Sequence, residues 1–374
     1  MGEHILVTGG AGFVGSHLVD ALLVAGHRVR VFDSLEPQVH GADGEIPTYL
    51  NPRAELVRGS VTDARAVASA LDGIDAVLHH AAAVGVGQSM YDIVHYCHAN
   101  TVGAAVLLEE IVKRRSRIRK VVVASSMSVY GEGAYRTPSG EMRAPKVRGR
   151  DHLERGEWEM RDPEMAEPLA PMPTPETKPL HPTSVYAITK RDHEELFLTV
   201  GYAYRIPTVA LRYFNIYGER QALSNPYTGV AAIFSSRVLN GQTPTLFEDG
   251  EQSRDFVHVS DIVQANLLAL ETDRADYEAL NVGTGQPTTV RGVADAILGA
   301  LDRTDLTPCV LGTFREGDIR HCYADISRAR ELLRYAPKVT FSDGMRRLVE
   351  WVRGQRAVDS FDQAHRQLVE RGLA

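Results

Sequence analysis

The sequence has few cysteines, no long hydrophobic run and no block of like charges. Its three cysteines, Cys97, Cys309 and Cys322, stand far apart among 374 residues. Neither a disulfide framework nor a zinc site is therefore expected, and the cytoplasm is the predicted compartment. No apolar stretch approaches the roughly 18 residues of a membrane span, and no basic leader precedes the first apolar residues, so we expect neither a membrane segment nor export. The net charge of −7 is spread along the chain, which argues against a nucleic-acid-binding surface.

What the chain does contain, in its first third, is an alternation of short apolar runs with amphipathic stretches. This alternation predicts βαβ units, and the continuous apolar runs predict parallel strands buried on both faces. Predicted strands cover residues 4–8, 28–32, 55–57, 76–79, 120–124 and 208–211. Predicted helices cover residues 12–25, 64–71, 100–115, 185–204, 229–239, 259–270, 290–301, 326–333 and 341–352. The expected fold is α/β, a Rossmann-type doubly wound parallel sheet.

A glycine motif follows the first predicted strand directly. Gly9, Gly12 and Gly15 recur at every third residue between that strand and a helix. In this position the first glycine permits a tight turn, the second lets the backbone approach a pyrophosphate, and the third lets helix and strand pack closely. The pyrophosphate then meets the free N–H groups and the positive end of the helix. The motif predicts a bound dinucleotide.

Asp33 ends the second predicted strand and indicates which dinucleotide is bound. A carboxylate there accepts hydrogen bonds from the adenosine ribose and repels a 2′-phosphate, so NAD is favoured over NADP. The alternative is an acidic residue that merely begins a surface loop. Asp63, after the third predicted strand, could meet the adenine in a similar way.

Tyr186 and Lys190 form a candidate catalytic pair. They are four residues apart in a predicted helix and therefore lie on one face. Of the 14 tyrosines, only Tyr186 has lysine at the fourth position after it. A nearby ammonium favours the phenolate and would lower the tyrosine pKa from about 10, giving a base for an alcohol proton. The alternative is a pair that simply shares an exposed helix face.

A serine-rich run ends the fifth predicted strand and includes Ser125, Ser126 and Ser128. Polar side chains at the carboxyl end of a central strand face the ligand crevice of an open α/β sheet. Read alone, the run could also be a turn.

The chain divides by composition into three parts. Residues 1–215 form the predicted dinucleotide-binding domain, residues 216–353 a smaller C-terminal lobe whose chain could cross back to the first domain, and residues 354–374 a polar tail with a loosely docked helix. Within the first domain, residues 132–182 are rich in Pro, Glu and Arg and show little periodicity. Because this insertion leaves just after Ser126 and returns just before Tyr186, we expect it to shape the ligand pocket, with a surface excursion as the alternative.

Taken in order, these motifs resemble the extended short-chain dehydrogenase/reductase superfamily, and within it the NAD-dependent epimerase/dehydratase family, which acts on nucleotide sugars. The resemblance runs from about residue 3 to residue 353. It rests on positions 9–15, 33, 79–82, 100, 125–131, 186–190, 212–215, 253–258 and 315–318. It implies NAD as the cofactor, a nucleotide-diphosphate sugar as the substrate, a C-terminal substrate-binding lobe, and a homodimer formed through helices 100–115 and 185–204.

The resemblance also implies a role for each matching residue. The implied catalytic residues are Ser126, Tyr186 and Lys190. The implied cofactor-binding residues are Gly9, Gly12, Phe13, Val14, Gly15, Asp33, Val61, Asp63, Ala81, Ala82, Asn100, Ser125, Tyr186, Lys190 and Tyr213. The implied substrate-binding residues are Val86, Ser126, Met127, Asn215, Asn225, Arg254, Arg315 and Asp318. Arginine suits a diphosphate because guanidinium binds phosphate oxygens bidentately, although a surface ion pair is the alternative for each arginine.

Met127 and Ser128 narrow the implied reaction. Members of the family that are 4,6-dehydratases resemble one another in having Asp-Glu after the catalytic Ser or Thr, because removing water needs an acid and a base. Related decarboxylases have Glu at the second position, and this chain has neither residue. The closest resemblance is to nucleotide-sugar 4-epimerases of the dTDP-L-rhamnose 4-epimerase group, in which hydride leaves sugar C4 and returns to the opposite face of a 4-keto intermediate. A dehydratase, decarboxylase, reductase or other-position epimerase is the alternative, and dTDP and UDP stay open as the nucleotide.

Two departures from the family bear on metal binding. His79-His80 replaces a more usual His-Leu, and the 132–182 segment lacks the cysteine pairs that some relatives carry there. Without nearby cysteine or carboxylate clusters, structural histidines are expected and no metal site is predicted.

Overall fold

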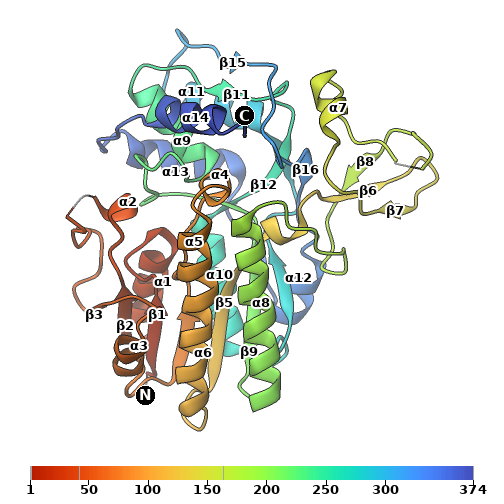
Figure 1. The fold of residues 1–374 in the computed structure, drawn as a ribbon. Helices are drawn as coiled ribbons and strands as arrows, with labels where there is room; N and C mark the ends of the chain where they lie inside the picture. Colours follow the sequence, from red (N-terminus) through yellow and green to blue (C-terminus); the bar gives the residue numbers. More distant parts are fainter. Residues whose placement is uncertain (1, 42, 163, 374) are drawn as a thin grey trace.

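A computed structural model describes residues 2–41, 43–162 and 164–373 of the protein. Figure 1 shows two stacked parts, a larger sheet-and-helix layer that holds the N-terminus and a smaller lobe that holds the C-terminus. Within the described ranges, no helix is both long and apolar enough to cross a membrane.

The larger part is built on a seven-stranded sheet with the order β13-β9-β5-β4-β1-β2-β3, in which every neighbouring pair is parallel. Its strands are β1 (His4–Thr8), β2 (Arg28–Asp33), β3 (Glu55–Arg58), β4 (Ala76–His79), β5 (Lys120–Ser126), β9 (Thr208–Tyr213) and β13 (Ala279–Val282). The strand order reverses between β1 and β4. Ligands of open α/β sheets bind at such a reversal, outside the carboxyl ends of the strands.

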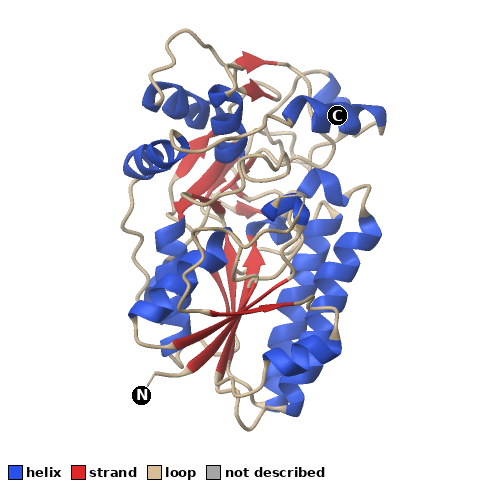
Figure 2. Cartoon of the chain, turned by 90° about the vertical axis from the view of Figure 1, so that its left-hand side faces the viewer, coloured by secondary structure: helices blue, strands red, loops and turns tan. Residues whose placement is uncertain are grey.

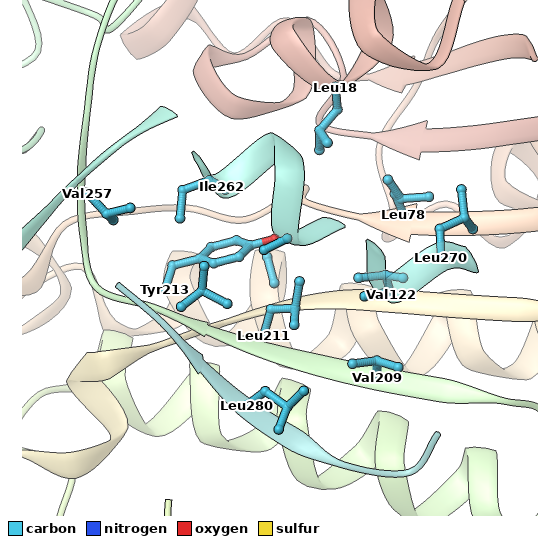
Figure 3. Close-up of a cluster of buried hydrophobic side chains, with 14 of the residues drawn as sticks. Leu18, Leu78, Val122, Val209, Leu211, Tyr213, Val257, Ile262, Leu270 and Leu280 are labelled. Carbon is cyan, nitrogen blue, oxygen red and sulfur yellow. The ribbon is translucent and has the colours of Figure 1, made fainter. Parts of the chain in front are cut away.

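Helices cover both faces of this sheet (Figure 2). One face carries α1 (Phe13–Val24), α10 (Val259–Glu271) and α12 (Ser327–Leu333), and the other carries α3 (Ala64–Ala70), α6 (Gly103–Lys113) and α8 (Val185–Tyr204). Figure 3 shows the first interface, where Leu18 of α1 and Ile262 of α10 pack on the side of the sheet that carries Leu78 and Val122. All four side chains are fully buried, and burying one such side chain contributes about 1.5–3 kcal/mol. Packing on both faces explains why the strands read as continuous apolar runs.

The smaller lobe has its own apolar core, which includes Phe234, Ile297 and Leu348. Its helices are α9 (Val230–Leu239), α11 (Val290–Ala300) and α13 (Phe341–Val352), and its strands are β10 (Asn215–Tyr217), β11 (Thr245–Leu246), β12 (Ser253–His258), β14 (Pro287–Thr289), β15 (Cys309–Val310) and β16 (His321–Cys322). Between these elements of the lobe the chain also forms β13, which pairs with β9 of the large sheet. The chain therefore passes from the lobe into the sheet and back.

The 132–182 segment contains more regular structure than its composition predicts. It forms a small antiparallel sheet of β7 (Met142–Arg143), β6 (Ala134–Arg136) and β8 (Ala170–Met172), together with α7 (Arg150–Glu154). The segment lies beside β16 and the lobe (Figure 1). Buried charges hold it there, because Arg320 contacts Glu159 of the segment at 2.5 Å and Asp249 of the lobe at 2.6 Å. Arg148 of the segment likewise bonds Glu248 of the lobe at 2.7 Å.

The predicted elements are confirmed, with two local differences. The predicted helix 100–115 begins as a π-helix, η1 (Cys97–Val102), and continues as α6. The tail helix α14 (Phe361–Glu370) is docked rather than loose, since Ala364 and Leu368 are buried. The pattern gave no signal for three short helices, α2 (Pro37–His40), α4 (Val86–Ser89) and α5 (Ile93–Tyr96), nor for η2 (Met127–Tyr130).

Candidate active site

The glycine motif forms a close-packed turn between β1 and α1. Gly9 has a φ of +68°, and a Cβ at this position would lie 2.7 Å from the backbone nitrogen of Ala81. A Cβ on Gly15 would lie 2.2 Å from the carbonyl oxygen of Gly9. At Gly12, which begins α1, the nearest atom to an added Cβ is 3.3 Å away. The turn is thus closed on the protein side and more open at the helix N-terminus, as a pyrophosphate site requires. Phe13 and Val14 form the first turn of α1.

Asp33 holds the glycine turn from the end of β2. Its Oδ2 accepts a hydrogen bond from the nitrogen of Ala11 at 2.9 Å, and its Oδ1 accepts one from Leu35 at 2.9 Å. Asp63 instead caps α3, because its Oδ1 accepts from the nitrogens of Arg65 and Ala66 at 2.9 and 3.2 Å. Its described contacts are therefore those of a helix cap.

Tyr186 and Lys190 lie one turn apart near the beginning of α8. Ser184 caps this helix, with its hydroxyl accepting from the nitrogen of Ala187 at 3.1 Å. The nitrogen of Tyr186 donates to Oγ of Ser89 at 3.0 Å. This contact fixes the beginning of α8 to α4, the short helix that follows β4.

The pKa of Tyr186 is raised, although the sequence predicts that Lys190 lowers it. Loss of contact with water raises the pKa of Tyr186 to about 12, and a hydrogen bond with Ser126 acts in the opposite direction. Burial lowers the pKa of Lys190 to about 7. The expected lowering of the Tyr186 pKa by Lys190 is not found, and the largest effect is the removal of the phenolate from water, which raises the pKa.

Lys190 belongs to a buried chain of polar contacts. Its Nζ lies 3.4 Å from Nδ1 of His193, and Nε2 of His193 lies 2.9 Å from the carbonyl oxygen of Asn100. A carbonyl only accepts, so we assign the hydrogen to Nε2 and leave Nδ1 to accept from the ammonium. The side chain of Asn100 in turn bonds the nitrogen of Ala83 at 2.7 Å and Oγ1 of Thr189 at 2.9 Å. The π-helix η1, a form common at functional sites, thereby connects the loop after β4 to α8.

Ser126 and Ser125 face different neighbours. Ser126 ends β5, where its Oγ accepts from Oγ of Ser128 at 2.9 Å, and its side chain acts on Tyr186 to lower the pKa of the phenol. The Ser125 hydroxyl donates to the buried carboxylate of Glu194 at 2.7 Å, and Nε of Arg212 reaches the same carboxylate oxygen at 2.9 Å. The structure therefore brings Ser126 to Tyr186, whereas the Ser125 hydroxyl, implied to bind the cofactor, serves an internal ion pair.

The residues around the end of β4 are largely internal. The hydroxyl of Tyr213 donates to Asn266 at 2.9 Å and its ring stacks on His80, so this side chain, implied to bind the cofactor, belongs to the core (Figure 3). Burial lowers the pKa of His80 to about 3 and that of His79 well below its usual value. In the described part of the chain, no group of three or more His, Cys, Asp or Glu side chains could hold a metal ion. Ala81 and Ala82 lie in the loop beyond these histidines, and Val61 is buried.

Four of the implied substrate residues, Asn215, Arg254, Arg315 and Asp318, belong to the lobe. Arg254 donates to the carbonyl oxygen of Ile319 at 2.6 Å, and Arg315 pairs with Asp318 at 2.7 Å. Both arginines therefore border the same short segment, 315–320, in agreement with a shared ligand. Arg254 is, however, already engaged by backbone carbonyls. Oδ1 of Asn215 is buried without a hydrogen-bond partner among the described residues, which marks it as an acceptor available to a ligand.

The remaining implied substrate residues occupy three different settings. Val86 begins α4 and is exposed, and Met127 begins η2 and is buried. Asn225 accepts a hydrogen bond from Gln38 at 3.2 Å, which joins the lobe to the segment after β2.

Sequence reasoning missed His193 and Glu194. His193 is three residues after Lys190 and seven after Tyr186, so helical spacing already places it on the same face of α8. Glu194 is four residues after Lys190, and its pairing with Arg212 is visible only in the folded chain, because the two come from different elements.

Comparisons with known proteins agree with this geometry. The NAD dependent epimerase/dehydratase family matches residues 5–148 and 163–283. The dTDP-L-rhamnose 4-epimerase of Burkholderia thailandensis is 35% identical over 94% of this chain and 95% of its own length. Among solved structures, the UDP-glucose 4-epimerase of Thermotoga maritima with UDP-glucose has a TM-score of 0.76 at 33% identity, over 94% of this chain and 98% of its own. The Thermus thermophilus UDP-glucose 4-epimerase with NAD has a TM-score of 0.73 at 31% identity, over 94% and 100% of the two chains.

Proposed function

This chain belongs to the NAD-dependent epimerase/dehydratase family, and we propose that it is a nucleotide-sugar 4-epimerase in which Ser126, Tyr186 and Lys190 are the catalytic residues. The observation that carries the proposal is that α8, which holds Tyr186 and Lys190, packs against β5, so that Tyr186 lies beside Ser126 at the carboxyl end of that strand. The reaction is transient oxidation of the sugar at C4 and return of the hydride to the opposite face. Curated relatives and solved neighbours with 4-epimerase activity support this choice.

The residues present fit NAD. The glycine turn leaves the N-terminus of α1 open beside Gly12, and Asp33 places a buried carboxylate at the end of β2. Bound NAD⁺ would supply a hydride acceptor that carries a positive charge, and a nearby positive charge favours the phenolate form of a tyrosine.

Each catalytic residue then has a distinct task. Tyr186 takes the proton of the sugar hydroxyl and later gives it back. Ser126 hydrogen-bonds the same sugar oxygen, with Ser128 holding the Ser126 hydroxyl in place at 2.9 Å. Lys190, oriented by His193, stabilises the phenolate and holds the cofactor ribose.

The surroundings of Ser126 favour epimerisation over elimination. A dehydratase needs a free acid and a free base near the reacting carbons. The two positions after Ser126 are Met127 and Ser128, and the carboxylate of nearby Glu194 is bound by Arg212. Hydride and proton transfer at one carbon needs neither group.

We further propose a dTDP- or UDP-sugar as the substrate, bound through Asn215, Asn225, Arg254, Arg315 and Asp318, and a homodimer formed through the helices within residues 100–115 and 185–204. Support for the dimer comes from exposed apolar residues, since Val102 of η1 is 41% and Ile188 of α8 48% exposed, and Val94 of the neighbouring α5 is 81% exposed. Apolar patches of this kind are typical of interaction surfaces. Three free cysteines suit the reducing cytoplasm, which we propose as the compartment.

The test is incubation with 4-epimer pairs of dTDP- and UDP-sugars without added reductant. An isobaric 4-epimer that keeps a deuterium label placed at C4 is the expected product. A product that has lost water or carbon dioxide, or a requirement for external reductant, would replace 4-epimerisation by the alternative chemistry. Tyr186→Phe should abolish turnover and leave NAD bound, whereas Tyr202→Phe, an exposed tyrosine of the same helix, should stay close to wild type.

A further inference from the structure

The tail helix α14 touches segments from both parts of the molecule. Oε1 of Gln367 accepts hydrogen bonds from the hydroxyl of Tyr91 at 3.2 Å and from that of Tyr227 at 3.0 Å. Tyr91 follows α4 in the dinucleotide-binding part, and Tyr227 precedes α9 in the lobe. The guanidinium of Arg371 lies 4.4 Å from the centre of the Tyr91 ring. One side chain of the tail thus joins the dinucleotide-binding part to the lobe.

The contact with α4 leads directly to the candidate base. Leu368 is buried, and its methyl groups lie 3.5 Å from where a Cβ of Gly87 would be. Two residues further along α4, Ser89 accepts the hydrogen bond from the nitrogen of Tyr186. The helix α14 is therefore separated from the beginning of α8 by a single short helix.

The tail also reaches the candidate phosphate-binding side. His365 packs against the ring of Phe247 with centroids 5.4 Å apart, and Arg315 lies over the same ring at 4.5 Å. The carbonyl oxygen of Leu373 accepts a hydrogen bond from the nitrogen of Glu316 at 3.2 Å. The implied substrate residue Arg315 is thus connected to the tail through the Phe247 ring and through its neighbour Glu316.

We propose that α14 closes the nucleotide-sugar cleft and retains the 4-keto intermediate during the reaction. This proposal rests on the proposed 4-epimerase function. The keto sugar must rotate to present its opposite face before the hydride returns, so the pocket cannot hold the sugar ring tightly in one pose. Retention has to come from the walls of the cleft. Leu368 and Arg371 of α14 contact the side formed by Gly87 and Tyr91, and Gln367 contacts this side and Tyr227 of the lobe.

Release of the 4-keto intermediate would leave the cofactor reduced, which can be measured. The released 4-keto sugar has lost two electrons and two protons. A hydride, which is one proton with two electrons, stays on the cofactor, and the hydroxyl proton stays on Tyr186. An enzyme that has lost its intermediate therefore holds reduced cofactor and is inactive until it is reoxidised.

The test compares Gln367→Ala/Leu368→Ala with the matched control Arg366→Ala/Val369→Ala, whose side chains are exposed on α14. With the substrate that wild type interconverts, the first variant should accumulate the near-ultraviolet absorbance of reduced cofactor about tenfold faster per turnover, the scale of losing ordinary hydrogen bonds. Borodeuteride should reduce the free 4-keto nucleotide sugar in that sample and label it with deuterium at C4. The control should match wild type.

A chain ending at residue 360 keeps Asp359 beside Arg237 and gives a second variant, which should leak intermediate at least as strongly. Retained NAD and cooperative thermal unfolding show that each variant is folded. Folded variants that show no reduced cofactor and no trapped ketone would overturn the closing role of α14. Wild type that interconverts no 4-epimer would instead overturn the proposed function on which this role rests.

Discussion

Nζ of Lys190 lies 3.4 Å from Nδ1 of His193, and the other nitrogen of that imidazole is occupied by the carbonyl oxygen of Asn100. The ring can therefore present only an acceptor to the lysine. Because burial lowers the pKa of His193 well below its usual value, the ring stays neutral at physiological pH. A neutral acceptor favours the ammonium form of a lysine that burial otherwise disfavours.

Removing this acceptor should weaken catalysis without unfolding the protein. His193→Ala is expected to lower kcat by about ten- to a hundredfold, the scale of a hydrogen bond to a charged group. The alkaline limb of the pH–rate profile should also move to lower pH, because the ammonium loses support. His193→Asn, whose Oδ1 takes the place of Nδ1, should recover part of both effects, whereas His193→Gln should not. Identical pH profiles for the three variants would contradict a positioning role. His152→Ala, on the half-exposed histidine of α7, serves as control.

Replacing the buried Lys190 by a neutral residue should stabilise the folded protein. Its folded pKa of about 7 lies below the ordinary value of 10.5, so between these pH values the unfolded chain binds more protons and stability rises with pH. Lys190→Met should therefore raise Tm by a few degrees at pH 6 to 7, with the gain shrinking toward pH 10, while activity is lost. Lys146→Met, on an exposed lysine, should show no such pH-dependent gain. A Tm difference that is constant across pH would contradict the assigned cause.

Gly15 should not tolerate a methyl group. The carbonyl oxygen of Gly9 lies 2.2 Å from the position of the added Cβ, and this oxygen belongs to the backbone of the turn, which cannot move aside. Gly15→Ala is expected to reduce the free energy of unfolding by about 1–3 kcal/mol or more and to abolish NAD binding. Gly299→Ala, in helix α11 with no atom within 4 Å of the added Cβ, should be neutral or stabilise by up to about 1 kcal/mol. Chemical denaturation and calorimetric titration with NAD measure both effects.

Asp33 should control both the affinity and the choice of cofactor. Asp33→Ala removes two hydrogen bonds to the backbone of the turn region as well as the negative charge. NAD affinity should fall by about ten- to a hundredfold, and the preference for NAD over NADP should shrink. Asp72→Ala, on a carboxylate with 78% exposed side chain, should change neither quantity. If Asp33→Ala prefers NAD over NADP as strongly as wild type does, repulsion of the 2′-phosphate by this carboxylate is contradicted.

Periodicity along the chain predicted most of the fold, because buried strands and amphipathic helices have to repeat with their own geometry. The ends of β1, β4 and α8 agree with the predicted ranges. The π-helix η1 was not predicted, and the bonds of its Asn100 to Ala83 and Thr189 join parts of the chain that are distant in sequence. The small sheet of the 132–182 segment was missed because its strands are too short to show a period.

The residues of the candidate site were more predictable from the sequence than their pKa values were. Spacing placed Tyr186 and Lys190 on one face, and the same rule applied once more would have found His193. The order of their pKa values was not predictable, because desolvation depends on what packs around each group. The hydrogen bonds that Ser125 and Tyr213 make inside the protein were not predictable either, because their partners Glu194 and Asn266 come from other elements.

The buried charges beneath the 132–182 segment limit how the protein can be recombined with its relatives. Arg320 is 1% exposed and is shared between Glu159 of the segment and Glu248 and Asp249 of the lobe. A chimera that shortens the segment alone would take Glu159 from Arg320 and Arg148 from the buried carboxylate of Glu248. Removing one partner of a buried pair such as Arg148–Glu248 costs about 3–5 kcal/mol. The segment and the lobe surface around Arg320 therefore form one exchangeable module, and a graft that alters specificity has to carry both.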